Sequence, residues 1–164
     1  MKKIVISIVL ANLLVACASQ KPKEAEKPAP APEPVVEQAA PAPVVEVDPL
    51  NDPANILSSR SVYYALDKDA VEGTYRPLVQ AHGKYLGEHS DRNVRVEGNA
   101  DERGSNEYNL ALGQRRANGV KKMLVLSGAK SSQIETVSYG EEKPKATGHN
   151  ESSWSQNRRS DIKY

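Results

Sequence analysis

The sequence predicts one α+β domain, an α/β sandwich in which helices pack on one face of a mixed four-stranded sheet. Two observations lead to this fold class. Short runs rich in β-branched and aromatic residues alternate with longer segments in which apolar residues recur every three or four positions. Their order is strand, helix, strand, helix, strand, strand, which is typical of a small sheet with helices on one side.

The elements expected in the first half of the domain are a strand at residues 61–66, a helix at 74–90 and a strand at 93–97. The first strand is β-branched and aromatic, and it ends at Asp67. The helix has Pro77 in its first turn, where proline is tolerated. The second strand alternates strictly, so Val94 and Val96 are expected to face a core.

The elements expected in the second half are a helix from Ser105 or Asn106 to about Gly128, a strand at 134–139, a helical turn at 152–156 and a last strand at 158–164. The apolar stripe of this helix is formed by Leu110, Ala117, Val120 and Leu124. Gly113 and Gly119 weaken the helix, which indicates a close approach of another chain segment. Asp161 and Lys163 charge one face of the last strand, which is expected to meet solvent or a partner.

The N-terminal third has the pattern of an exported, lipid-anchored protein. Residues 1–16 place two lysines before an apolar run that is too short to span a bilayer, so they form a signal peptide. The run ends in Leu-Val-Ala-Cys, and the only cysteine of the chain, Cys17, is the expected lipidation site. Residues 17–55 are rich in Pro, Ala and Glu and predict an extended tether. The folded domain is therefore expected at residues 56–164.

The composition of this domain argues against nucleic-acid binding and catalysis. Basic and acidic residues are interleaved and nearly balanced, so there is no basic stripe for a nucleic acid. His82, His89 and His149 lack the spacing of a metal site, and no metal or cofactor is expected. Asp101 and Glu102 are neighbours, which does not place two carboxylates across a sugar bond. We expect a binding protein and not an enzyme.

One constellation of residues indicates a ligand site. Asp101 follows the second strand in a glycine-containing loop, a usual position for ligand contacts. In the next helix, Asn109, Leu112, Gly113 and Arg116 share one face, and an arginine side chain points back toward the helix N-terminus. A carboxylate and a guanidinium on an exposed rim could receive the ammonium and carboxylate of a free amino-acid centre. A structural salt bridge between Asp101 and Arg116 is the alternative.

Several motifs resemble those of the OmpA-like peptidoglycan-binding domain family. They are GNADERGSNEYN at residues 98–109, LGQRRA at 112–117, VSYG at 137–140, EKP at 142–144, GH at 148–149 and NRR at 157–159. The resemblance covers almost the whole domain. It implies that Asp101 and Arg116 recognise the diaminopimelate residue of the peptidoglycan stem peptide.

The resemblance also implies ligand roles for Asn109, Leu112, Asp67 and Arg158. For three of these residues a structural role is an open alternative. Asp67 could instead end the strand as a capping acid, Arg158 could form a structural ion pair, and Leu112 could belong to the core.

The same resemblance implies partners and a location. Lipoproteins of this family lie at the periplasmic face of the outer membrane, anchored by their lipids. With Ala18 rather than an aspartate after Cys17, this chain is expected there too. Peptidoglycan and the periplasmic β-propeller protein TolB of the Tol system are the implied partners. The implied function is a noncovalent tether between the outer membrane and the cell wall.

Overall fold

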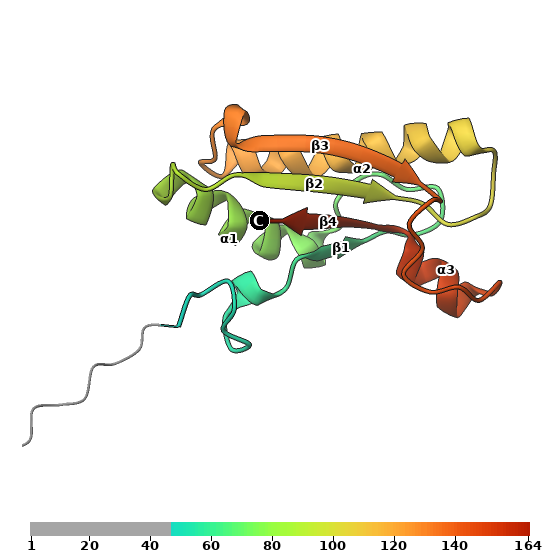
Figure 1. Cartoon of the computed structure of the whole chain (residues 1–164), viewed down its shortest axis with the longest axis horizontal. Coiled ribbons are helices and arrows are strands. Elements are labelled where there is room, and N and C mark those ends of the chain that lie inside the picture. Colours follow the sequence, from blue (N-terminus) through green and yellow to red (C-terminus); the bar gives the residue numbers. More distant parts are fainter. Residues whose placement is uncertain (1–46) are drawn as a thin grey trace, which may run out of the picture. The chain divides into compact units, whose positions relative to one another are not determined.

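The structure is a computed structural model that describes residues 47–164 (Figure 1). The expected signal peptide, Cys17 and most of the expected tether fall in residues 1–46, outside the described part. In chain order the elements are η1 (Ile56–Ser58), β1 (Ser61–Tyr63), η2 (Gly73–Tyr75), α1 (Arg76–Glu88), β2 (Val94–Asn99), α2 (Asn106–Leu126), η3 (Ser131–Gln133), β3 (Ile134–Gly140), α3 (Glu151–Asn157) and β4 (Arg159–Lys163), where η marks a short 3-10 helix. None of the helices in residues 47–164 has the length and apolar character needed to cross a membrane.

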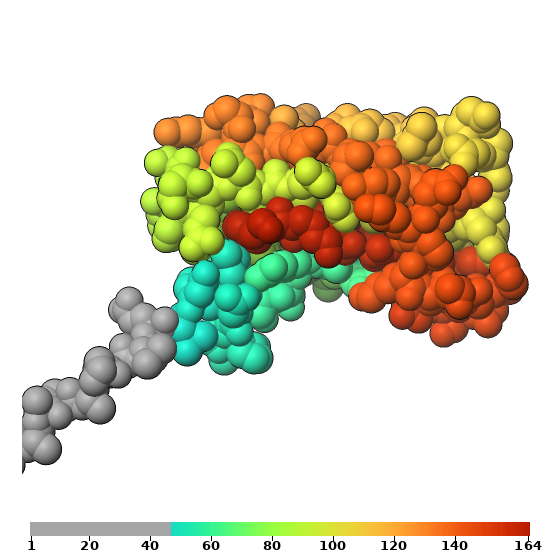
Figure 2. Space-filling view, viewed as in Figure 1, coloured from blue at the N-terminus to red at the C-terminus, as the bar shows by residue number. Residues whose placement is uncertain are grey.

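The four strands form one mixed sheet in the order β1-β4-β2-β3. The last strand, β4, is antiparallel to both of its neighbours, β1 and β2. Strands β2 and β3 are parallel and are connected by α2. In Figure 2 the segment around β4 (red) lies between β2 above it and the segment that contains β1 below it. The predicted fold class and order of elements are confirmed.

Helices α1 and α2 pack on the same face of the sheet, behind it in Figure 1. The core between the helices and the sheet is apolar. Val62, Val96 and Ile162 come from the sheet, Leu86 from α1 and Leu124 from α2, and all five are fully buried. The short helix α3 lies at one end of the sheet. That end, where β2 and β3 finish, is where the candidate site forms.

Helix α2 crosses β2 so closely that only glycine fits at the crossing. A Cβ atom added to Gly98 would lie 1.8 Å from the main-chain oxygen of Gly113. A Cβ atom added to Gly113 would lie 2.3 Å from Ser138 Oγ. Both distances are far below van der Waals contact, so a larger residue would push the helix off the sheet. The close approach expected at Gly113 is therefore present, and it packs the face of α2 that carries Gly113 tightly onto the sheet.

Strand β1 ends at Tyr63, before the end expected at residue 66. The amide of Tyr64 still donates to the Arg158 main-chain oxygen at 3.0 Å. The chain then turns, with the Lys68 amide donating to the Ala65 oxygen at 3.2 Å and Asp67 adopting a φ of +56°. Asp is one of the few residues besides glycine that tolerates this left-handed geometry. The β-branched and aromatic run thus continues past the strand into a turn that borders the site.

Two side chains lie in surroundings that differ from those expected. Leu110 was expected in the core but is 47% exposed. Its main chain lies over Gly140, the last residue of β3, and the sheet ends there. Asp161 was expected to meet solvent or a partner but is buried within the domain. It accepts hydrogen bonds from Arg159 Nε at 3.0 Å and Ser61 Oγ at 2.7 Å, so the charge is satisfied within the sheet.

The folded unit includes residues that the sequence analysis assigned to the tether. Leu50 is buried against Leu57 and Tyr85. Asp48 Oδ2 also lies 3.6 Å from Arg92 Nη2. The domain boundary predicted at residue 56 therefore moves toward the N-terminus, to Leu50 or before.

Candidate functional site

A cavity of about 310 Å³ opens at the end of the sheet, where the loops after β1 and β2 meet the first half of α2. This volume suits a small ligand or one end of a larger one. All six ligand-contact residues predicted from the sequence line this cavity: Asp67, Asp101, Asn109, Leu112, Arg116 and Arg158. The structure thus brings the predicted residues together, and their roles toward a ligand stay predictions.

Arg116 reaches from the inner face of α2 across the end of β2. Its Nη1 donates to the main-chain oxygen of Asn99 and its Nε to that of Lys68, both at 2.8 Å. A longer contact of 3.5 Å runs from Nη2 to the Ala65 oxygen. The guanidinium carbon lies 4.8 Å from the centre of the Tyr64 ring, a cation–π distance. Arg116 therefore connects α2 to both loops that border the cavity.

Arg116 is a buried cation without a carboxylate partner in the described part of the chain. It is 0% exposed, and it takes part in none of the nine ion pairs of residues 47–164. Burial lowers its pKa to about 10, which still leaves it charged at neutral pH. A guanidinium has five N–H groups, and the contacts above use three of them. The other two N–H groups have no hydrogen-bond partner among residues 47–164.

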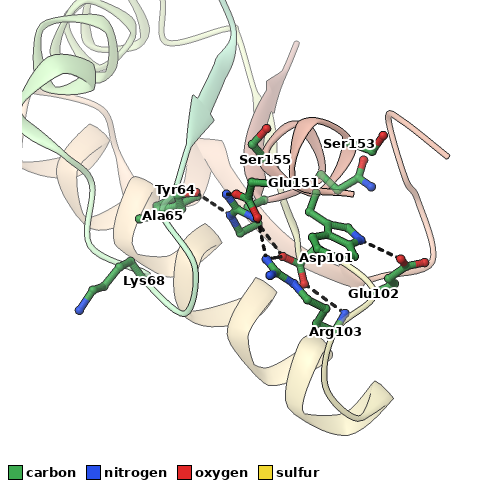
Figure 3. A network of polar contacts seen from close by, with 12 residues as sticks. Tyr64, Ala65, Lys68, Asp101, Glu102, Arg103, Glu151, Ser153 and Ser155 are labelled. Carbon is green, nitrogen blue, oxygen red and sulfur yellow. Dashed lines mark hydrogen bonds and ion pairs between the residues drawn. The ribbon is translucent and has the colours of Figure 1, made fainter. Parts of the chain in front are cut away.

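Asp101 pairs with two arginines, Arg103 and Arg158, and not with Arg116. Figure 3 shows Arg103 beside Asp101. Its Oδ2 accepts hydrogen bonds from Arg103 Nη2 at 2.7 Å and from Arg158 Nη1 at 3.2 Å. Its Oδ1 accepts one from the Arg103 main-chain amide at 3.1 Å. Burial by itself raises the pKa of Asp101, but the hydrogen bonds from Arg103 and Arg158 outweigh it and hold the pKa below its ordinary value. The carboxylate is ionised at neutral pH.

The exposed rim expected for Asp101 and Arg116 is wrong. Asp101 is only 4% exposed, and Arg116 is fully buried. The glycine crossing at Gly113 seats α2 directly on the sheet, so Arg116 points into the end of the sheet rather than into solvent. The turn after β1 then closes over it through Lys68. Both charged groups therefore support the fold as well as lining the cavity.

Three of the remaining predicted residues contribute in different ways. Leu112 is buried and gives the cavity an apolar wall. Asn109 is buried, and its Nδ2 donates to the carboxylate of Glu141. Asp67 is exposed at the mouth and accepts a hydrogen bond from the Tyr108 hydroxyl. Leu112 and Asn109 are thus fixed by packing, whereas Asp67 is held by its turn and one hydrogen bond.

Arg158 has the contacts of a structural residue. Its Nε donates to the Tyr64 main-chain oxygen at 3.0 Å, and its Nη2 donates to Glu151 Oε1 at 2.5 Å. With Asp101 it links the turn after β1, the loop after β2 and the start of α3. These contacts match the structural ion pair that was the alternative reading of Arg158, although the side chain also lines the cavity.

The sequence analysis missed several residues of the site. The other residues that line the cavity are Leu66, Arg103, Gly104 and Tyr108. Arg103 matters most, because it is the nearest cation to Asp101. Its position two residues after Asp101 in the same loop was the available signal. Tyr64, which lies under Arg116, could not be found this way, because its place depends on how β1 pairs with β4.

A second polar cluster lies beside the cavity, around Glu102. Its carboxylate accepts a hydrogen bond of 2.7 Å from Trp154 Nε1, and His149 Nδ1 lies 2.7 Å from Oε2. The hydrogen bonds from Trp154 and His149 lower the pKa of Glu102. Within residues 47–164 no three His, Cys, Asp or Glu side chains are placed to hold a metal ion. The main cavity contains the carboxylate of Asp101 and the buried guanidinium of Arg116. This pair of opposite charges suits a small dipolar group.

Comparison with known proteins places this chain in a family. Residues 63–158 match the OmpA family, so the chain belongs to that family. It is similar to curated proteins named peptidoglycan-associated lipoprotein. The relative from Pasteurella multocida is 49% identical over 104 residues, which are 63% of this chain and 69% of that protein. The relative from Pseudomonas aeruginosa is 44% identical over 114 residues, 70% of this chain and 67% of that protein.

Solved structures agree. The crystal structure of the peptidoglycan-associated lipoprotein from Burkholderia pseudomallei matches with a TM-score of 0.70 and 52% identity, over 71% of this chain and 99% of that one. The OmpA-like domain of FopA1 from Francisella tularensis matches with a TM-score of 0.55 at 20% identity, over 63% of this chain and 69% of that one, and shares the fold alone.

Proposed function

We propose that this chain binds peptidoglycan noncovalently through the diaminopimelate residue of the stem peptide. One observation carries the proposal. Arg116, a buried cation without a carboxylate partner in residues 47–164, lines the same cavity as the ionised Asp101. An uncrosslinked diaminopimelate ends in an ammonium and a carboxylate on one carbon. The ammonium pairs with Asp101 and the carboxylate with the free N–H groups of Arg116.

The comparisons support this proposal. The relatives at 44–49% identity are named for their association with peptidoglycan, and they are lipoproteins. Together with the lipidation site expected at Cys17, this supports an outer-membrane lipoprotein whose domain faces the periplasm. In this proposal the chain holds the outer membrane to the cell wall. It does so within the Tol-Pal system, which acts in envelope integrity and cell division.

The proposal includes TolB, the β-propeller protein of that system, as a second partner. Support comes from the similarity to peptidoglycan-associated lipoproteins. Mixing the purified chain with the propeller protein, with and without excess wall peptide, tests this part. A complex that forms alone and weakens as wall peptide is added is the expected result.

The proposed activity is binding without catalysis. In the cavity, Asp101 is held between two arginines and is not poised as a base. The adjacent Glu102 accepts a hydrogen bond from Trp154 Nε1 and lies 2.7 Å from His149 Nδ1, and these contacts hold it in place. Incubation with purified sacculi should leave no soluble fragments, and the protein should sediment with the wall. Release of muropeptides would contradict this part of the proposal.

The main test is co-sedimentation with two kinds of sacculi. Lysine-type wall has the ammonium of diaminopimelate but lacks the adjacent carboxylate. Because Arg116 needs that carboxylate, diaminopimelate-type wall should bind at least tenfold more tightly. Asp101→Asn should weaken binding by roughly 10- to 100-fold, since a hydrogen bond to a charged group contributes about 1.5–3 kcal/mol. Equal binding of both walls would remove the basis of the proposal.

Asp91→Asn is the matched control. Asp91 is an exposed acid in the loop between α1 and β2, and it is not among the residues that line the cavity. The two substitutions change the net charge equally. If both substitutions weaken sedimentation to the same extent, the effect is due to overall charge. That result would contradict a specific role of Asp101 in ligand binding.

A further inference from the structure

Arg103 occupies the position that a ligand ammonium would take at Asp101. Its Nη2 lies 2.7 Å from Asp101 Oδ2, closer than the Nη1 of Arg158 at 3.2 Å. Both arginines already contact this one oxygen, so a third cation at such a distance would be strongly repelled by them. A ligand ammonium that pairs with Asp101 therefore has to exchange with one of the two arginines.

Of the two arginines at Asp101, Arg103 is the one that can move away from the carboxylate. The Arg158 side chain is 6% exposed, and the Tyr64 oxygen and Glu151 hold it from two further sides. The Arg103 side chain is 32% exposed and comes from a loop. Its Nε is also buried with no hydrogen-bond partner in the described residues, so the hydrogen-bonding capacity of the guanidinium is only partly satisfied in this position.

A second place for the Arg103 guanidinium lies on α3. Glu151 Oε2 is already 3.5 Å from its Nη2. The Trp154 ring lies beneath it, with 4.2 Å between the guanidinium carbon and the ring centre. Figure 3 shows Arg103 beside Asp101, with Glu151 close to both. A small rotation would move Arg103 from one carboxylate to the other while it stays on the indole.

We propose that Arg103 is a latch that competes with a ligand ammonium for Asp101 and thereby lowers the preference of the cavity for ligands with a free amine. In the empty site it neutralises Asp101, and a ligand ammonium displaces it toward Glu151 and Trp154. A ligand without an ammonium cannot displace it. This inference rests on the proposed function, because it concerns the group that Asp101 receives. It makes Arg103 a positioning and specificity residue that acts through Asp101.

The test uses two soluble probes: the stem tripeptide that ends in diaminopimelate, and the same peptide with its distal amine acetylated. In the wild-type chain the gain from the ammonium is reduced by the loss of the Arg103 contact. In Arg103→Gln this loss is absent. The ratio of affinities for the free over the acetylated peptide should therefore rise at least threefold in Arg103→Gln.

The control is Arg95→Gln. Arg95 is also an arginine paired with a carboxylate, Glu135 at 3.0 Å, but it is exposed and is not part of the cavity. The two variants lose the same charge. Arg95→Gln should leave the ratio of affinities unchanged. If the ratio depended only on the long-range effect of losing one positive charge, it would change equally in both variants.

Fluorescence gives an independent readout, because Trp154 is the only tryptophan of the chain. Movement of a guanidinium stacked on the indole should change its emission. The free peptide should change the wild-type spectrum, and the acetylated peptide should not. In Arg103→Gln both peptides should leave the spectrum unchanged although the free peptide still binds.

The outcomes separate the two proposals. If wild-type protein binds neither peptide, the proposed function and the latch both fail. If wild-type protein binds the free peptide but Arg103→Gln shows the wild-type ratio and the wild-type spectral change, the latch alone is overturned. Circular dichroism of each variant reports whether the variant is folded. Folding is expected, since Asp101 keeps Arg158 and the main-chain amide of residue 103.

Discussion

Arg116 Nη1 donates a 2.8 Å hydrogen bond to the main-chain oxygen of Asn99, the last residue of β2. This bond joins the middle of α2 to the point where the chain leaves the sheet and enters the loop of Asp101. The residue expected to hold the ligand's carboxylate thus also fixes the loop that holds its ammonium. Binding and stability are coupled at this residue, so variants must be chosen to separate the two.

Arg116→Ala should destabilise the fold, contrary to the expectation that it would leave the fold intact. The change removes hydrogen bonds to three main-chain oxygens, of which that of Asn99 is buried, and leaves a cavity. We expect the free energy of unfolding in urea to fall by about 2–4 kcal/mol. The neighbouring Arg115→Ala is the control, because Arg115 is about half exposed and forms an ion pair with the equally exposed Asp69. Its loss should cost less than about 1 kcal/mol, and equal effects of the two would refute the structural role of Arg116.

Gly113→Ala and Gly119→Ala should have opposite effects, although both replace a glycine inside α2. At Gly113 the new methyl group would lie 2.3 Å from Ser138 Oγ and 2.8 Å from the Gly98 oxygen. At Gly119 the nearest atom would be 3.4 Å away, an ordinary contact. Alanine favours a helix by about 1 kcal/mol over glycine. Thermal unfolding should therefore show Gly119→Ala at or above wild-type stability and Gly113→Ala clearly below it.

His82 should make the fold sensitive to mild acid. It is fully buried between the Ser59 oxygen and the Tyr164 hydroxyl, each at 2.8 Å. Burial lowers its pKa below the unfolded value of about 6.5. Between the folded and the unfolded pKa the unfolded chain binds more protons, so stability is complete above pH 6.5 and falls as the pH decreases.

The measurement for His82 is urea unfolding at pH 7.5 and pH 5.5. The wild-type chain should lose more stability between these two values than His82→Gln, which stays neutral throughout. The carboxylates titrate in both proteins, so the difference between the proteins isolates His82. An equal loss in both would show that His82 is protonated in the folded state as readily as in the unfolded one.

Asp67 should be replaceable by asparagine but not by valine. Its φ of +56° is a left-handed geometry that Asn tolerates and that β-branched residues avoid. Asp67→Asn should change the free energy of unfolding by less than about 0.5 kcal/mol, whereas Asp67→Val should cost about 1–2 kcal/mol. Chemical denaturation of both variants distinguishes backbone strain from loss of charge. A wild-type value for Asp67→Val would mean that the turn does not constrain this residue.

The features predicted correctly from the sequence are those set by local pattern. The alternation around Val94 and Val96 depends on neighbouring positions, and so does the cap at Ser105, whose side chain accepts from the Tyr108 amide. The grouping of Asp101, Asn109, Leu112 and Arg116 at one cavity was predicted correctly because these residues lie in the loop after β2 and on one face of α2. Sequence pattern and resemblance were sufficient for these features.

The features predicted wrongly depend on contacts between distant segments. The burial of Arg116 requires main-chain oxygens from the turn after β1, and that of Asp161 requires Ser61, 100 residues away. The sequence does not show which distant residue will form an ion pair or hydrogen bond with a charged side chain. Charged side chains are therefore predicted to be exposed to solvent by default. The pairing of Asp101 with Arg103, two residues away in the same loop, could have been predicted. The sequence analysis instead considered only Arg116 in the following helix.

The position of β4 between β1 and β2 has a consequence for how the chain reaches its folded state. Strand β1 finds its partner only in β4, the last strand in chain order, among the strands of residues 47–164. During synthesis and export, β1 and one edge of β2 remain open until the final residues arrive, and open strand edges pair readily with other chains. Closing so long a loop also slows folding. The domain is therefore expected to need protection from association until its last strand has been delivered.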